Sequence, residues 1–162
     1  RSMTPNPKPT PDPLSKERLR LWLKLLKSSR MIEDEVRRRL RHEHDWTLPR
    51  FDVMSALSRS PDGLRMSEIS TMLKVSNGNI TGIVDKLESD GLAERVPVPG
   101  DRRANLVKLT GRGRTAFADH AAAHERWISE ILGQLNADDI DGMIRRLNPL
   151  IVLLEKQNRD AR

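Results

Sequence analysis

The arrangement of residues 66–109 restricts the possible folds of this chain more than any other feature. Two segments with apolar residues at helical spacing, Met66 to Leu73 and Asn77 to Asp90, are separated by a short connection. Ser76 is a favourable N-cap for the second segment, and Gly91 stands where a helix commonly stops. From Leu92 to Leu109, apolar and polar residues alternate around a turn that holds prolines and a glycine, which predicts two strands joined by a hairpin.

A helix, a tight turn, a second helix and a basic hairpin in this order are typical of a winged helix-turn-helix, whose second helix enters the major groove of DNA. On a helical wheel, one side of this second helix gathers Ile80, Ile83, Val84 and Leu87. Gly78 and Gly82 lie one turn apart on the other side. Each glycine costs about 1 kcal/mol of helix stability relative to alanine. Close approach of the helix backbone to DNA would explain both glycines; the alternative is a tolerant surface helix.

The turn of the hairpin, residues 99–105, carries two adjacent arginines. A protruding arginine can enter the narrow minor groove, where the potential is most negative. Residues 92–115 hold six basic and two acidic groups, net +4, between two mildly acidic segments. This charge indicates an anionic partner, although a solvated arginine-rich loop explains the charge alone equally well. The predicted DNA contacts are Ser76, Asn77, Gly78, Asn79, Thr81, Gly82, Asp85, Lys86, Asp101, Arg102, Arg103 and Asn105.

Long helical segments flank the predicted DNA-binding lobe. An amphipathic helix is predicted from residue 15 to about residue 41, after an arm in which residues 4–13 hold five prolines. Apolar residues recur at steps of three and four over residues 117–135 and again over 140–154, and Pro149 is expected to break or kink the last helix. Helices this long exceed what one small lobe covers, which favours a homodimer. The predicted dimer contacts are Leu19, Trp22, Ile140, Met143, Leu147, Leu150 and Leu154.

The predicted fold class is therefore mainly α with a small β-hairpin wing: a winged helix-turn-helix DNA-binding lobe joined to a helical dimerisation region. The chain has no cysteine, which excludes disulfides and thiol nucleophiles. No catalytic motif indicates an enzyme. Neither a signal segment nor the roughly 18 apolar residues of a membrane span appear, so we expect a cytoplasmic protein without a membrane partner. The expected regions are an extended arm (1–14), a dimerisation helix and connection (15–48), the DNA-binding lobe (49–110) and C-terminal dimerisation helices (111–162).

The hairpin motif resembles that of a known family. Asp101 to Thr110 fits the wing pattern D-x-R-x-x-x-x-x-L-T of the MarR family of bacterial transcription regulators, residues 75–92 resemble its recognition helix, and residues 48–54 resemble the opening of its second helix. The resemblance covers about residues 15–157. It implies a homodimer that binds a pseudopalindromic operator as double-stranded DNA, usually as a repressor. The glycine-rich recognition helix departs from most members.

The resemblance also implies a small anionic effector, often an aromatic acid or a related thioester, that releases the DNA. Its site would lie in a crevice between the dimerisation helices and the DNA-binding lobe. Arginine or histidine could pair with such an anion, and a tryptophan could stack on its ring. The candidate ligand-binding residues are Arg30, His42, His44, Trp46, Arg50, Met54, Phe117, His120 and His124.

Three alternatives remain open at this point. His120 and His124 have a spacing that can hold zinc, with His42 and His44 as further ligands, but His124 falls on the apolar seam, so no metal or other cofactor is predicted. An architectural protein would bind DNA without sequence preference or ligand control. A helical adaptor for protein partners is supported by the helical seams alone.

Overall fold

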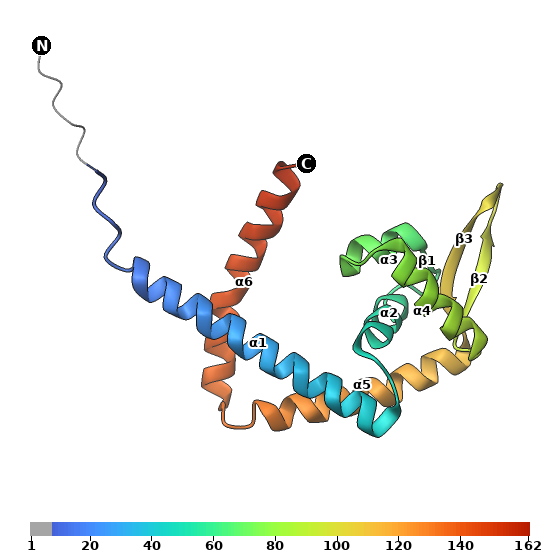
Figure 1. The fold of residues 1–162 in the computed structure, drawn as a ribbon, viewed down its shortest axis with the longest axis horizontal. Coiled ribbons are helices and arrows are strands. Elements are labelled where there is room, and N and C mark those ends of the chain that lie inside the picture. Colours follow the sequence, from blue (N-terminus) through green and yellow to red (C-terminus); the bar gives the residue numbers. More distant parts are fainter. Residues whose placement is uncertain (1–7) are drawn as a thin grey trace, which may run out of the picture. The chain divides into compact units, whose positions relative to one another are not determined.

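The structure, a computed structural model, describes residues 8–162, except for the side chains of Asn77, Arg102 and Arg103. The chain forms two compact units that divide between Arg50 and Phe51, and each unit is described by itself. Within residues 8–162, no helix is long and apolar enough to cross a membrane. Figure 1 shows the elements in chain order.

The first unit is dominated by helix α1 (Ser15–His44), which ends three residues beyond the predicted Arg41. Asp12 lies just before this helix. Its carboxylate accepts a hydrogen bond from the Leu14 backbone N–H at 2.8 Å and pairs with Arg18 at 2.6 Å. These two contacts, the backbone one first, lower the pKa of Asp12. Acidic groups of this kind are favourable at a helix N-terminus, and these two contacts connect the arm before Ser15 to the first turn of α1.

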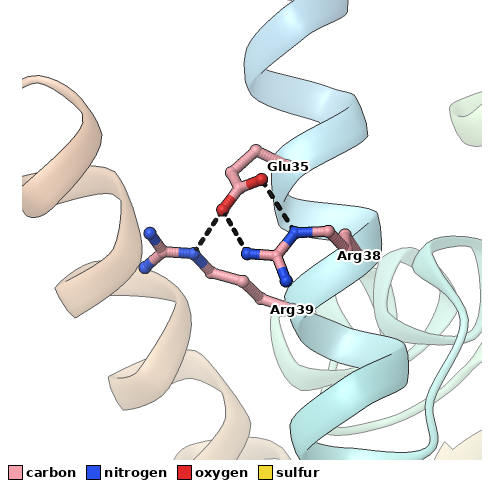
Figure 2. Close-up of polar contacts among 3 residues, drawn as sticks. All are labelled: Glu35, Arg38 and Arg39. Carbon is pink, nitrogen blue, oxygen red and sulfur yellow. Dashed lines mark hydrogen bonds and ion pairs between the residues drawn. The ribbon is translucent and has the colours of Figure 1, made fainter.

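One carboxylate organises the polar face of α1 near its C-terminal half. Glu35 accepts hydrogen bonds from Arg38 Nε at 3.0 Å, Arg38 Nη2 at 2.7 Å and Arg39 Nε at 2.9 Å, as Figure 2 shows. The bonds from Arg38, and then those from Arg39, lower the pKa of Glu35 to about 2. Residues three and four apart share a helix face, so local spacing alone brings the three groups together.

The second unit begins within helix α2, at Phe51, and holds residues 51–110 of the predicted lobe. Its core is made by apolar side chains such as Met54, Leu57, Ile69 and Val107. Its sheet has three antiparallel strands in the order β1-β3-β2, with Leu64 opposite Val107. The sequence predicted the β2–β3 hairpin but not β1, because a strand of two residues has no periodicity to detect. The elements are α2 (Leu48–Ser58), β1 (Leu64–Arg65), α3 (Met66–Leu73), α4 (Asn77–Ser89), β2 (Ala93–Val98) and β3 (Asp101–Leu109).

Two long helices, α5 (Gly111–Ile131) and α6 (Ala137–Asp160), complete the second unit. Helix α6 continues through Pro149, so the break that was one of the two outcomes expected at this proline does not occur. A proline removes one backbone N–H from the ladder of hydrogen bonds, and the helix here tolerates that loss. In α5, Ala123 and Trp127 are buried. The residues predicted at steps of three and four, such as Phe117, His124 and Ile128, are only half-buried. The buried face of α5 therefore lies to one side of the predicted one.

Candidate nucleic-acid interface

Helix α4 is held in the lobe by one face. The Ser76 hydroxyl caps it by accepting the Asn79 N–H at 3.4 Å. Ile80, Val84 and Leu87, which the helical wheel placed on the apolar side, are completely buried, whereas Ile83 of the same predicted face is half-buried. Burial of these three side chains fixes the rotation of α4 about its own axis and turns the opposite face to solvent.

Gly78 and Gly82 lie on that exposed face. A Cβ atom built on either glycine meets nothing within 4 Å, and neither residue has a positive φ. The described part of the chain therefore has no packing or backbone reason for glycine at these two positions. Each glycine weakens the helix, and the open space around both positions leaves room for a partner to approach the helix backbone closely.

The other contacts predicted on α4 are arranged around these glycines. Asn79 and Thr81 are exposed. Lys86 is exposed as well and pairs with Asp90 at 3.3 Å, one turn further along the helix. The side chain of Asn77 lies outside the described residues. The exposed face thus presents small and polar groups, which suits contact with base edges and phosphates.

The wing is formed by β2 and β3, which pair from Ala93 opposite Leu109 to Pro97 opposite Asn105 and become irregular after Pro97. Gly100 turns the chain at the tip with a φ of +82°, a conformation that favours glycine. Asp101 and Asn105 are exposed on β3. The predicted contacts of Arg102 and Arg103 fall on side chains outside the described residues.

Thr110 joins the base of the wing to α5. Its hydroxyl accepts the Gly113 N–H at 3.0 Å as the N-cap of α5 and donates to the carbonyl of Gly91 at 2.7 Å. The neighbouring Leu109 is buried. A Cβ at Gly113 would lie 1.9 Å from the carbonyl oxygen of Leu92. The residues from Leu109 to Gly113 thus connect the wing to α5 through hydrogen bonds and close backbone packing.

Asp85, a predicted DNA contact, is already engaged within the protein. Arg95 of β2 donates from Nη2 to the Asp85 carboxylate at 2.7 Å and from Nη1 to Glu88 at 2.5 Å. The Asp85 bond is the first cause that raises the pKa of Arg95. Sequence analysis missed Arg95, because the contact joins residues ten apart across two elements.

The predicted ligand-binding residues fall in both units. In the first unit, the Arg50 guanidinium lies 4.8 Å from the centroid of the buried Trp46 ring, His44 is half-buried, and Arg30 and His42 are exposed.

In the second unit, Met54 is completely buried, and His120 is half-buried. Phe117 and His124 both contact the ring of Phe51, at centroid distances of 5.5 and 5.1 Å. Phe51, which sequence analysis had not included, therefore gathers two of the predicted residues. Among the described residues, no three His, Asp or Glu side chains gather as a metal ion would require.

A capped helix with one buried face and an open glycine face, followed by a two-stranded wing, defines a winged helix-turn-helix DNA-binding protein. Residues 44–104 match the sequence profile described as MarR family. The crystal structure of a MarR family transcriptional regulator from Silicibacter pomeroyi is 32% identical and has a TM-score of 0.68, with 91% of this chain and 99% of that chain covered. The chain belongs to the MarR family and is a DNA-binding transcriptional regulator, as its sequence predicted.

Further relatives are regulators as well, not enzymes. The transcriptional activatory protein BadR of Rhodopseudomonas palustris is 29% identical over 143 residues, which cover 86% of this chain and 79% of BadR. FabT of Streptococcus pneumoniae, solved in complex with DNA, is 25% identical with a TM-score of 0.66 over 88% of this chain and 99% of that one. The MarR family protein RV2887 of Mycobacterium tuberculosis, solved with salicylic acid, is 27% identical with a TM-score of 0.65 over 78% and 92%.

Proposed function

We propose that the protein is a ligand-responsive repressor that binds a pseudopalindromic operator as a homodimer. The observation that carries the DNA-binding part is the open glycine face of α4. In this proposal the lobe of residues 49–110 contacts DNA through the α4 and wing residues predicted above, apart from Asp85, whose carboxylate binds Arg95. Residues 15–48 and 111–162 supply the dimer contacts.

The dimer is supported by apolar side chains that the single chain leaves in water. Gly142 is the one buried residue of α6 among those described. Ile140, Met143, Leu150 and Leu154 on this helix are exposed. Monomeric soluble proteins rarely expose contiguous apolar patches of this kind. A second copy presents the same helix and satisfies both surfaces through a twofold interface. The exposed Leu19 and Trp22 of α1 are proposed to join this interface.

The effector is proposed to be a small aromatic acid or its thioester. The salicylic acid bound by RV2887 is such a compound. Arg50 over Trp46 combines a cation with an aromatic ring, which are the two groups that such a ligand needs. Ligand binding would change the distance between the two recognition helices, which must match successive major grooves about 34 Å apart. Because linkage is reciprocal, a ligand that weakens DNA binding tenfold is itself bound tenfold more weakly by the DNA complex.

Repression is the direction we propose for regulation. A dimer seated on an operator within a promoter excludes polymerase, and release by the effector restores transcription. BadR, by its name, activates. A promoter–reporter fusion with and without the protein decides the direction: repression predicts a higher signal when the protein is absent, and a lower signal contradicts it.

Gly82→Ala tests the proposed contact between α4 and DNA. Here the operator is the duplex that the protein selects from a random-sequence pool. Because the new Cβ meets nothing, we expect the variant to be more stable to urea, by about 1 kcal/mol. The same Cβ would stand between α4 and the groove, so operator affinity should fall at least about tenfold, as one or more base contacts are lost. Fluorescence anisotropy measures the affinity.

Ser89→Ala is the matched control. Ser89 is exposed at the C-terminal end of the same helix, away from the end expected to reach the bases. Its substitution should leave operator affinity unchanged. Full affinity in Gly82→Ala would show that DNA does not approach this face of α4.

A further inference from the structure

One guanidinium connects the recognition helix to the wing. Arg95 lies on β2, opposite Val107 of β3. Its two terminal nitrogens bind two different carboxylates of α4, Nη2 that of Asp85 at 2.7 Å and Nη1 that of Glu88 at 2.5 Å. Asp85 and Glu88 are three residues apart and therefore share one face of the helix. The planar fork of arginine suits two simultaneous partners, which a lysine ammonium does not hold in a fixed geometry.

The position of this contact allows it to restrict the orientation of the wing relative to α4. Figure 1 shows α4 beside the β2–β3 hairpin, whose free end extends away from the lobe. The covalent link from α4 to β2 runs through residues 90–92, where Gly91 has a φ of +74°. Beyond this short link, Arg95 provides an ionic connection between the two elements. The side chain of Arg95 is 27% exposed, less than those of Asp85 and Glu88, so the guanidinium lies between the helix and the strand.

The contact also explains an acidic residue on a surface that faces DNA. An unpaired carboxylate on the exposed side of α4 would repel phosphate groups. With Arg95 between them, the charges of Asp85 and Glu88 are partly offset. Asp85 therefore has a role within the protein, and no base contact is needed to account for it.

We propose that Arg95 is a positioning residue for DNA recognition: with Asp85 and Glu88 it holds the wing at the orientation in which the wing and α4 enter adjacent grooves together. The proposal rests on the DNA-binding function proposed above. Arg95 acts through the wing and does not itself contact the operator.

If Arg95 instead contacted a phosphate directly, one double variant would change operator affinity in the opposite direction. In Asp85→Asn with Glu88→Gln, two negative charges disappear and the guanidinium is released. A direct contact would then tighten operator binding. For a positioning residue, operator affinity falls about tenfold while binding to a scrambled duplex is unchanged or slightly stronger. Tighter operator binding by this double variant overturns the proposal.

The variant Arg95→Lys gives a second distinction, because it keeps the positive charge but not the planar fork that binds both carboxylates. A direct phosphate contact predicts that Arg95→Lys binds the operator more tightly than Arg95→Gln does. For a positioning residue, we expect both variants to bind the operator equally weakly, and recovery of affinity in Arg95→Lys would overturn the proposal. The control is Lys108→Gln, which removes a cation of the same sheet that pairs across strands with Glu94 at 3.8 Å. This control should keep its preference for the operator.

A distance measurement without DNA separates this proposal from the proposed function. The chain has no cysteine, so Ser89→Cys and Pro99→Cys place spin labels on α4 and the wing turn alone. Electron paramagnetic resonance should give a narrow distance distribution for this labelled parent and a broader one after Arg95→Gln, with helix content unchanged by circular dichroism. An equally narrow distribution overturns the positioning role. A broader distribution in a protein that prefers no DNA sequence would instead refute the proposed function and leave the contact in place.

Discussion

Replacing Leu150 and Leu154 with aspartate is expected to produce a monomer and to weaken operator binding about a thousandfold. The two side chains are 46% and 48% exposed in the single chain, so the substitution buries no charge unless a second copy covers them. In a dimer, four carboxylates would enter an apolar interface without partners. The free energy needed to bury these charges far exceeds the free energy that the apolar contact contributes. A monomer then binds one half-site and loses the effective concentration that links two half-sites, which is worth about 10²- to 10⁴-fold.

The control carries the same charge on the same helix. Gln157→Asp with Asn158→Asp adds two carboxylates at exposed positions near the end of α6. It should remain a dimer in analytical ultracentrifugation and bind the operator with little change beyond general electrostatics. A dimer that survives Leu150→Asp with Leu154→Asp, measured in the same way, would place the interface elsewhere.

Gly113→Ala is expected to cost about 3 kcal/mol or more of the free energy of unfolding. The added Cβ would stand 1.9 Å from the carbonyl oxygen of Leu92 and 2.8 Å from its carbonyl carbon. Both are backbone atoms, in the segment between α4 and β2, and cannot rotate away as a side chain does. Relief requires α5 to move from the base of the wing, where Thr110 is hydrogen-bonded to Gly91. Urea unfolding followed by circular dichroism measures the loss.

Gly111→Ala, in the same first turn of α5, is the matched control for Gly113→Ala. A Cβ at Gly111 has one neighbour within 4 Å, the Arg114 guanidinium at 3.8 Å, which is ordinary contact. Since alanine favours helix more than glycine, this variant should be as stable as the parent or up to about 1 kcal/mol more stable. Equal stability of the two variants would mean that α5 and Leu92 do not approach as closely as described.

Local signals explain why parts of the fold were predictable from the sequence. Helix α3 has the predicted bounds, and α4 begins at the predicted Asn77 and ends one residue before the predicted Asp90. These helices are short and amphipathic, and α4 begins after a side-chain cap at Ser76. Strand β1 was missed because two residues pair with β3 only once the lobe has folded. At Pro149 the predicted break does not occur, because a helix tolerates a single missing hydrogen bond when the residues on both sides continue it.

In the candidate site, too, features set by local sequence were predictable, whereas contacts between separate elements were not. The outward face of Gly78 and Gly82 follows from helical periodicity, and the structure places both in open space. The pairing of Arg95 with Asp85 depends on how β2 packs beside α4, which no spacing reveals. Likewise, Phe51 meets Phe117 and His124 only when α2 and α5 are brought together. Sequence reasoning therefore identified the helix and the hairpin that we propose as the DNA-binding elements, but not the contacts that orient them.

We propose above all that the protein recognises a particular DNA sequence as a dimer, through α4 and the wing. The most direct test is an anisotropy titration, at about 150 mM salt, against the duplex selected from a random pool and against a scrambled copy. We expect a pseudopalindromic selected site, one dimer per duplex, and a preference of about 10³-fold or more over the scrambled copy. Selection without a common motif, with equal and weak binding to both duplexes, would contradict it and identify an architectural DNA-binding protein instead.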